Sequence, residues 1–519
     1  MRSAPVPSSI VALALSLVGT LAVAETPPPA PVESAPPPAA PAPPAQLPPA
    51  PPPAAAPQAP LMAPPPPAVA PTPPPVPATD EAGPLSLKIG SASLTPLGFV
   101  DFTGVFRSSA VGSGIGTNFG SIPYGTVYGS KLTETRLSVQ NSRLGFRLDA
   151  PVLGSHVIGY MESDFLGAAP GNVAVSSNSN TLRSRLYWVD LRKGDWEVLG
   201  GQTWSLITPN RVGISPLPAE VFNTLDMDVN YQAGLVWGRI PELRVVYHPS
   251  DMFAAAVALD SPEQYIGGSA GGGTVTLPMG LAMSLSNMQL NAGNSTFTVP
   301  NVAPDVIVKA AFDVPSRFHV ELGGVERQFK IWNPLSDQTF SATGVGGFLN
   351  FNAQLFEGFR LIGNAFVSSG GGRYIFGQAP DVVVRADGSL STVKSSSTVD
   401  GVELTLGSTQ LYAYYGGIYI AHNTSPAADG TPCTDAMSCV GYGYQGSPNG
   451  QNKWIQEGSG GFIQTFWKAP KYGALSVIGQ YSYLSRAPWY VAAGAPSNAH
   501  TNMVFLDLRY TLPGAPPRM

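Results

Sequence analysis

The stretch TRLSVQNSRLGFRLDA, residues 135–150, carries the pattern that decides the fold. From Arg143 onward, charged and apolar side chains alternate, as they do along a β-strand whose two faces meet different surroundings. The charged row and the apolar row are, respectively, Arg143, Arg147 and Asp149, and Leu144, Phe146 and Leu148. What covers the apolar row follows from the rest of the chain.

The same alternation recurs between Thr95 and Leu512, a region that divides into about sixteen candidate strands of ~10 residues. Helical periodicity is absent from this region, so we expect no helices over the apolar rows. No stretch after the first 24 residues approaches the ~18 uninterrupted apolar residues of a membrane-spanning helix. We therefore expect lipid to cover the apolar rows.

The connections between the candidate strands alternate in length. The short connections are residues 151–155, 193–195, 249–251, 315–317, 356–359, 407–409 and 470–472. The long connections are residues 107–133, 167–180, 207–239, 261–303, 332–341, 371–396, 421–452 and 487–499. Short turns at one rim and long loops at the other are typical of outer-membrane barrels. The sequence predicts an all-β fold: a transmembrane antiparallel β-barrel of about 16 strands over residues 85–519, surrounded by the lipid of a bacterial outer membrane.

The first 84 residues have a different composition. Residues 1–24 contain Arg2, an apolar core and the small-residue site Ala22-Val23-Ala24, which predicts a cleaved signal peptide, with a membrane anchor as the alternative. Residues 25–84 are predicted to form a disordered periplasmic linker, because residues 27–77 are mostly proline and alanine and cannot build a core. This segment could contact the cell wall as a tether or remain a solvated linker without a partner.

Cys433 and Cys439 are the two cysteines of the chain, and five residues separate them in a segment rich in turn residues. In an exported protein this spacing favours a local disulfide. A metal pair is the alternative, but histidines or further cysteines at ligand spacing are absent from the neighbouring sequence.

Because the apolar rows face lipid, the polar rows are predicted to face the interior, and sixteen strands enclose an aqueous channel. A single charge on a strand usually lies on a solvated face, so the prediction rests on the parity that these charges share across strands. The predicted pore-lining residues are Arg143, Arg147, Glu162, Asp164, Arg183, Arg185, Arg244, Arg317, Asp507 and Arg509.

Two stretches do not follow the alternation. Leu137 and Val139 share the parity of Arg143, which predicts either a β-bulge near Asn141 or a strand that leaves the membrane there. Residues 410–421, QLYAYYGGIYIA, do not alternate clearly, and their faces stay unassigned.

The long third connection, residues 207–239, is predicted to fold into the barrel as a constriction loop. Its apolar side chains would lie bare if the loop were exposed outside the cell. An external lid is the alternative. Acids on this loop opposite arginines on the wall would narrow the channel and set a transverse field. The charged residues of the predicted constriction loop are Arg211, Glu220, Asp226 and Asp228.

Residues 135–167, followed by TLRSRLYWVDL and GGQTWSLITPN, resemble the DcaP-like trimeric outer-membrane porins, which are related to the sixteen-stranded porins. The resemblance implies a homotrimer, an inward third loop and diffusion of small hydrophilic, often anionic or dicarboxylate solutes. By matching motif it places Gln202 in the channel wall, together with Arg143, Arg147, Glu162, Asp164, Arg183 and Arg185. This chain departs from the family pattern in its Pro/Ala-rich N-terminal segment and in the residues TLPGAPPRM after Tyr510.

The sequence thus predicts a porin that passes small hydrophilic solutes by passive diffusion. The wall charges assigned by parity give a slight basic excess, which favours a weak anion preference. The basic set is Arg143, Arg147, Arg183, Arg185, Arg244, Lys309, Arg317 and Arg509, and the acidic set is Asp101, Glu162, Asp164, Asp313, Glu321 and Asp507. No cofactor is expected, and the formal net charge of -5 gives no indication of a nucleic-acid partner.

Two rival functions stay open. A non-conducting structural or adhesive barrel, tethered to the cell wall, is the main alternative. An enzyme is disfavoured, because the GGSAG match at residues 267–271 lies in a glycine run and not between a strand and a helix.

Overall fold

The structure, a computed structural model, describes residues 85–513 with gaps at 168–179, 217–220, 227–230, 269–272, 287, 294–297 and 429–431. The chain divides into two units, Met1–Pro77 and Ala78–Met519. The predicted signal peptide, residues 1–24, and the whole of the predicted linker, residues 25–84, lie outside the described residues. The description below therefore concerns the second unit.

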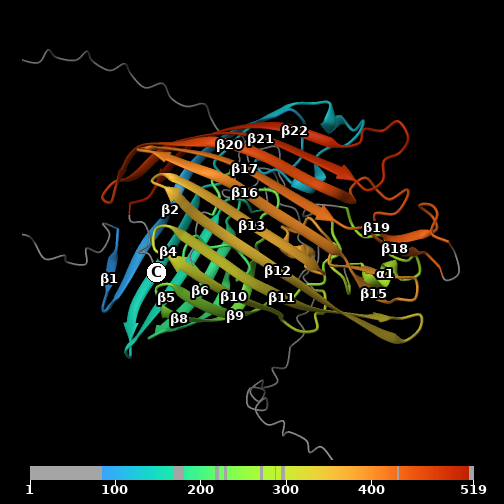
Figure 1. The fold of residues 1–519 in the computed structure, drawn as a ribbon, viewed down its shortest axis with the longest axis horizontal. Helices are drawn as coiled ribbons and strands as arrows, with labels where there is room; N and C mark the ends of the chain where they lie inside the picture. Colours follow the sequence, from blue (N-terminus) through green and yellow to red (C-terminus); the bar gives the residue numbers. More distant parts are fainter. Residues whose placement is uncertain are drawn as a thin grey trace, which may run out of the picture. The chain divides into compact units, whose positions relative to one another are not determined.

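Within the described residues, sixteen antiparallel strands form a closed barrel, as predicted (Figure 1). The first half of the wall comprises β2 (Ala92–Arg107), the broken strand β3 (Glu134–Ser138) and β4 (Arg143–Val152), β5 (Ser155–Asp164), β6 (Arg183–Lys193), β7 (Trp196–Trp204), β8 (Arg239–Ser250), β9 (Phe253–Asp260) and β10 (Asp305–Val314). The second half comprises β11 (Phe318–Asn333), β12 (Gln338–Phe356), β13 (Phe359–Ser369), β16 (Lys394–Leu406), β17 (Thr409–Ile420), β20 (Asn452–Ala469), β21 (Gly473–Pro488) and β22 (Ala499–Thr511). Pairing of β2 with β22, from Phe99 opposite Thr511 to Arg107 opposite Met503, closes the ring.

The smaller elements lie at the ends of the barrel. Strand β1 (Leu87–Ile89) pairs with the start of β2. The long loops contain β14 (Val382–Val384), β15 (Leu390–Thr392), β18 (Asn423–Pro426), β19 (Cys439–Tyr442), the one-turn helix α1 (Ala282–Leu285) and 3-10 turns at Phe119–Ser121, Tyr128–Ser130 and Gly372–Tyr374. Among the residues that the structure describes, no helix is long and apolar enough to cross a membrane.

All seven predicted short turns are confirmed. Of the eight predicted long loops, the one at residues 167–180 lies almost wholly outside the described residues, and six of the other seven connect strands at the opposite rim. The exception is residues 332–341, for which the prediction of a long loop is wrong. There β11 and β12 stay paired up to Asn333 opposite Gln338 and leave a turn of residues 334–337. Asp337 adopts φ of 54°, which permits the tight reversal, and its carboxylate accepts a hydrogen bond from the Trp332 indole at 3.0 Å. The hairpin projects from the barrel in Figure 1.

The strand faces confirm the prediction from alternation. Outward side chains such as Leu144, 45% exposed, and Leu506, 61% exposed, are large and apolar. Inward side chains on the same two strands, such as Arg143 and Asp507, are buried. An apolar outer row without a protein partner is the signature of a surface covered by lipid.

The bulge predicted near Asn141 is present. Thr103 of β2 pairs with Ser138, and Phe99 pairs with Arg143. The β2 side advances four residues while the opposite side advances five, so one extra residue is accommodated and the parity of the row inverts. The Asn141 side chain fills the break by donating a hydrogen bond to the Thr103 hydroxyl at 3.1 Å.

The faces of residues 410–421 are resolved by the structure. On β17, Tyr412, Tyr414 and Ile418 are buried on the inward face, whereas Leu411 and Tyr415 are exposed on the outward face. The alternation is invisible in the sequence because both rows are apolar or aromatic.

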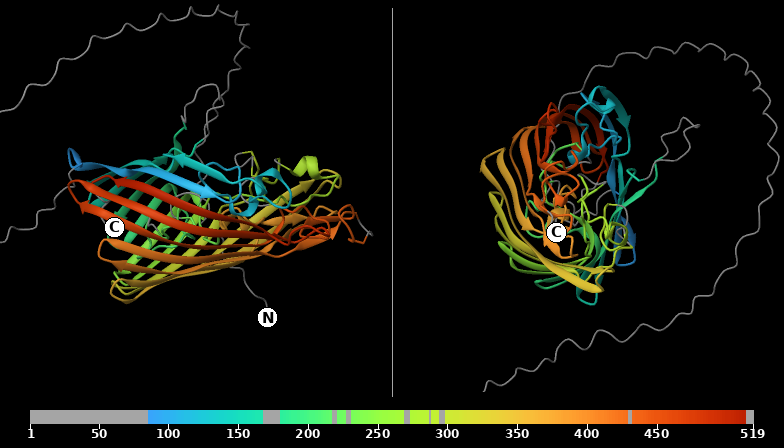
Figure 2. Two further views of the ribbon diagram at one scale, coloured as in Figure 1. Left: turned by 90° about the horizontal axis from the view of Figure 1, so that it is seen from above. Right: turned by 90° about the vertical axis from the view of Figure 1, so that its right-hand side faces the viewer.

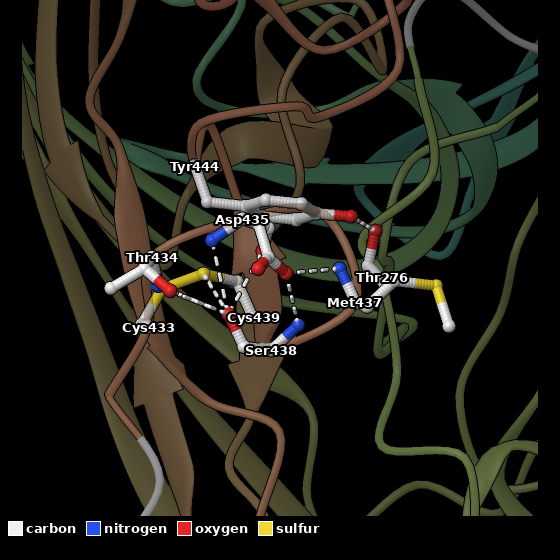
Figure 3. The surroundings of a disulfide bond; sticks show 8 residues. All are labelled: Thr276, Cys433, Thr434, Asp435, Met437, Ser438, Cys439 and Tyr444. Carbon is white, nitrogen blue, oxygen red and sulfur yellow. Dashed lines mark hydrogen bonds between the residues drawn. A yellow bond between two sulfur atoms is a disulfide. The ribbon is translucent and has the colours of Figure 1, made fainter.

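The disulfide between Cys433 and Cys439 is formed, as predicted (Figure 3). Within its small loop, the Asp435 carboxylate accepts hydrogen bonds of 2.9 Å from the backbone amides of Met437 and Ser438. The bond closes a short local loop beside the β18–β19 hairpin and does not connect barrel strands.

Placing a charge on the lipid face should destabilise the barrel. We expect Leu506→Arg, near the middle of β22, to lower the free energy of unfolding by about 2–4 kcal/mol in a lipid bilayer. Leu153→Arg is the matched control, because Leu153 lies in the exposed turn between β4 and β5. Urea titration followed by tryptophan fluorescence measures both. Equal, small effects would contradict a lipid-facing position for Leu506.

Removing the disulfide should affect its own loop alone. We expect the double variant Cys433→Ser, Cys439→Ser to keep the heat-modifiable gel migration of a folded barrel, because the bond closes so short a loop. Proteolysis within residues 433–439 should become faster. Loss of the folded band in the double variant would show that the bond supports the barrel itself.

Candidate functional site

The connection between β7 and β8, here called the inward loop (residues 205–238), contacts the inside of the barrel wall in its described parts, which exclude residues 217–220 and 227–230. Near its start, the ammonium of Lys309 on β10 donates a hydrogen bond to the Thr208 carbonyl at 2.7 Å. Near its end, the Ala233 amide donates to the Glu457 carboxylate on β20 at 2.7 Å. The described parts of the loop therefore reach opposite walls of the ring, which confirms the predicted inward third loop (Figure 2).

Apolar packing fixes this inward position. Phe222 is fully buried, and its ring meets Tyr414 of β17 edge-on with centroids 5.1 Å apart. Gly416 of β17 allows the loop backbone to approach, since a Cβ there would overlap the carbonyl oxygen of Ala233. Val212 remains exposed, and Leu217 lies outside the described residues.

Two of the four predicted charged residues of the constriction loop are described. Arg211 forms a two-pronged ion pair with Glu403 of β16, with nitrogen to oxygen distances of 2.5 and 2.8 Å. Asp226 is fully buried, and one carboxylate oxygen accepts a hydrogen bond from the Gln480 amide of β21 at 2.7 Å. Glu220 and Asp228 lie outside the described residues.

Several of the predicted wall residues fall into two groups, and ion pairs connect the members of each group. In the first, on β5 and β6, Arg183 pairs with Asp164 at 2.6 Å, and Arg185 bridges Glu162 at 2.6 Å and Asp164 at 2.7 Å. Gln202 of β7 joins this group by donating to the Arg185 carbonyl at 2.7 Å.

The second group closes the seam of the barrel. Arg509 of β22 pairs with Asp507 at 3.0 Å on the same strand and with Asp101 at 2.9 Å on β2. Ion pairs that cross the seam in this way neutralise wall charges locally.

Of the remaining predicted wall residues, Arg143, Arg147 and Arg244 are buried on the inward face, whereas Arg317 does not lie on the wall. Arg147 pairs with Asp149 at 2.8 Å, the Arg143 guanidinium lies 5.1 Å from the Phe99 ring centroid, and Arg244 pairs with Glu242 at 2.6 Å. The prediction for Arg317 is wrong, because this residue lies exposed in the turn between β10 and β11 and not on a strand.

The expected basic excess of the wall is also wrong. Several inward acids escaped the parity assignment, and Asp190 shows why. A register shift beside Glu162 and Ser163 inverts the parity of β6 after Arg185, so Asp190 points inward although Arg183 and Arg185 predict the opposite row. The other buried acids that parity missed are Glu197, Glu242, Asp260, Asp305, Glu403 and Glu457.

A second connection also folds inward and was not anticipated. The connection between β13 and β16, here called the second inward loop (residues 370–393), is held by Asp381, which pairs with Arg327 of β11 at 2.6 Å. The Tyr374 hydroxyl donates to Asp305 at 2.9 Å, and the Trp237 amide donates to the Tyr374 carbonyl at 3.0 Å. These contacts attach the second inward loop to the wall and to the inward loop.

Burial changes the acidity of Asp381, which attaches the second inward loop to the wall. Removal from water raises the pKa of Asp381 to about 6, and the Arg327 guanidinium opposes that rise by favouring the carboxylate. Backbone amides of Arg373 at 2.9 Å and Tyr265 at 3.0 Å also donate to this carboxylate. The predicted long connection at residues 371–396 and the glycine run at residues 370–372 indicate a loop here, but neither specifies partners so distant in sequence.

Two cavities adjoin the inward loops. One, of about 340 Å³, has Arg239, Glu263 and Arg373 among its lining residues. The other, of about 230 Å³, has Arg183 and Arg239 as its charged lining residues. The charged groups at these cavities are therefore mainly guanidinium groups, although the buried wall carries many acids.

Comparison with known proteins agrees with this architecture. No model of a protein family and no curated protein matches the chain in sequence. Among solved structures, the outer membrane channel DcaP of Acinetobacter baumannii is similar with a TM-score of 0.58 and 17% identity, over 82% of this chain and 99% of DcaP. OmpT of Vibrio cholerae gives 0.43 and 10% over 82% and 99%, and an anion-selective porin from Comamonas acidovorans gives 0.42 and 13% over 81% and 100%. The DcaP likeness confirms the predicted resemblance at the level of the fold.

Neutralising Glu403 should loosen the inward loop. We expect Glu403→Gln to raise open-channel noise and to increase mean conductance by on the order of 20–50%, because Arg211 loses its charged anchor and the loop can retract. Glu197→Gln is the matched control, since Glu197 pairs with Arg192 at 2.6 Å, away from the loop. Planar-bilayer recording measures both variants. Traces for Glu403→Gln that match the control would contradict the anchoring role.

Proposed function

We propose that this protein is an outer-membrane porin that forms a water-filled channel for passive diffusion of small hydrophilic solutes. The observation that carries the proposal is the two-sided barrel wall, which is apolar toward lipid and lined by paired charges toward the interior. The inward loop narrows that interior and supplies charged groups there, and channels use such narrowing and such charges to limit the size and charge of the solutes that pass.

A weak anion preference is part of the proposal. It rests on the charged groups that line the two cavities, where guanidinium groups outnumber carboxylates, although Arg183 and Arg373 also pair with acids of the barrel. Arg183, Arg239 and Arg373 line these cavities, and Glu263 is the acid among the described lining residues. A guanidinium group partly exposed to water attracts anions over roughly 8 Å at physiological salt.

The assembly and the N-terminal segment complete the proposal. We propose a homotrimer, as the resemblance to DcaP-like porins implies. We also propose residues 1–24 as a signal peptide and residues 27–77 as a periplasmic segment that can contact the cell wall. Deleting residues 27–77 and measuring association of the protein with purified cell wall tests the contact.

The alternative, a non-conducting structural or adhesive barrel tethered to the cell wall, is favoured by one observation. The outer loops interlock: Thr276 and Gly441 exchange backbone hydrogen bonds of 2.9 and 2.8 Å, and the Thr276 and Tyr444 hydroxyls lie 2.8 Å apart (Figure 3). Conductance across a planar bilayer separates the two functions. Ser269 of the GGSAG match lies outside the described residues.

Ion selectivity should depend on Arg239. In a KCl gradient we expect the wild-type reversal potential to show preference for chloride, and we expect Arg239→Gln to lower the chloride to potassium permeability ratio by roughly two-fold. Arg136→Gln is the matched control, since Arg136 is an exposed residue of β3 that pairs with Glu134. Clear cation selectivity of the wild-type protein would contradict the anion preference.

A further inference from the structure

An aromatic cluster joins the two inward loops. Trp237 and Tyr231 of the inward loop pack with centroids 4.5 Å apart, and Phe376 of the second inward loop lies 4.9 Å from Trp237 and 5.5 Å from Tyr231. The ring of Phe119, from the connection between β2 and β3, lies 5.9 Å from that of Phe376 between centroids. Rings from three separate connections therefore meet at one place inside the barrel.

Phe376 and Trp237 differ from the rest of the cluster in their exposure. Phe119 and Tyr231 are buried, whereas Phe376 and Trp237 are only partly buried. Both of the latter line the cavity of about 340 Å³ and also the cavity of about 230 Å³. Arg239 is the third residue that the two cavities share. Phe376 and Trp237 thus border both cavities. A residue of the hydrophobic core would instead be surrounded by packed side chains.

The backbone at Phe376 is held in an unusual conformation. Its φ of 53° lies in the left-handed region, which a residue with a bulky side chain rarely adopts. Hydrogen bonds fix the backbone on both sides: the Trp237 amide donates to Tyr374, and the Tyr265 hydroxyl donates to the Gly377 carbonyl at 2.7 Å. Because the backbone is fixed from two loops, the Phe376 ring is presented at a defined position.

A charged group accompanies the rings. The Arg239 guanidinium carbon lies 5.6 Å from the Trp237 ring centroid and 5.7 Å from that of Trp204, at cation–π distances. A solute that moves between the two cavities would pass the apolar edges of Phe376 and Trp237 beside this cation.

We propose that Phe376 and Trp237 form an aromatic constriction between the two cavities and that Phe376 sets the upper size of the solutes that pass. This inference rests on the proposed channel function. It assigns a role in limiting solute size to the second inward loop, in addition to the narrowing by the inward loop. Arg239 then acts on the charge of the solute, and the rings act on its width.

The test compares the wild-type protein with Phe376→Ala in planar bilayers and in liposomes that swell as neutral sugars enter. We expect Phe376→Ala to raise single-channel conductance about two-fold and to increase disaccharide entry more than pentose entry, because the constriction widens. Phe376→Leu, which keeps apolar packing with a smaller side chain, should give an intermediate effect.

Phe119→Ala is the matched control, since Phe119 packs on Phe376 but does not line either cavity. It should keep wild-type sugar selectivity if the ring of Phe376 itself restricts the path. Heat-modifiable gel migration verifies that each variant is folded. If Phe376→Ala does not fold, the Phe376→Leu variant decides the question by the same two measurements.

The outcomes separate this inference from the proposed function. Conducting wild-type protein with unchanged conductance and sugar selectivity in both Phe376 variants would overturn the aromatic constriction and leave the porin function standing. Wild-type protein that does not conduct would overturn the porin function. In that case, a Phe376→Ala variant that opens a conducting pore would support the constriction, and one that stays closed would overturn it too.

Discussion

The structure depends on one constraint: in hydrocarbon, every backbone amide and carbonyl must find its hydrogen-bond partner within the protein. An open sheet cannot meet this constraint at its edges, so β2 must pair with β22 along Phe99–Arg107. Once the ring is closed, alternation along each strand sends one row of side chains to lipid and the other to the interior. The outer row can then be apolar without a protein core beneath it, which explains the exposure of Leu144 and Leu506.

The interior meets a second requirement, because charges that face a narrow lumen need partners. Arg185 bridges Glu162 and Asp164 within the wall, and Arg509 joins Asp507 and Asp101 across the seam. The same requirement positions the two loops that enter the barrel, since Arg211 and Asp381 are held by Glu403 and Arg327 on the wall. The ion pairs that stabilise the interior thus also hold the two loops inside the barrel, beside the aromatic rings and the guanidinium groups that line the two cavities.

Strand parity and turn length made the barrel, its lipid-facing row and its inward third loop predictable from the sequence. The assignment of inward and outward faces from parity failed where one extra residue reverses which side chains of a strand point inward. At Asn141 the apolar residues before the inversion revealed the bulge, whereas after Arg185 no such mismatch was recognised and Asp190 was missed. The long β11–β12 hairpin was taken for a loop. The second inward loop could not be predicted, because Arg327 and Asp381 are 54 positions apart and their pairing exists only in the folded barrel.

The central claim is that hydrocarbon covers the outer row of these strands. The most direct measurement refolds the purified chain from urea into buffer alone and, in parallel, into buffer with detergent micelles or lipid vesicles, and follows the heat-modifiable folded species. We predict that the folded species forms only where detergent or lipid is present, and that the chain aggregates in buffer alone. A folded, monodisperse protein in plain buffer would contradict the account.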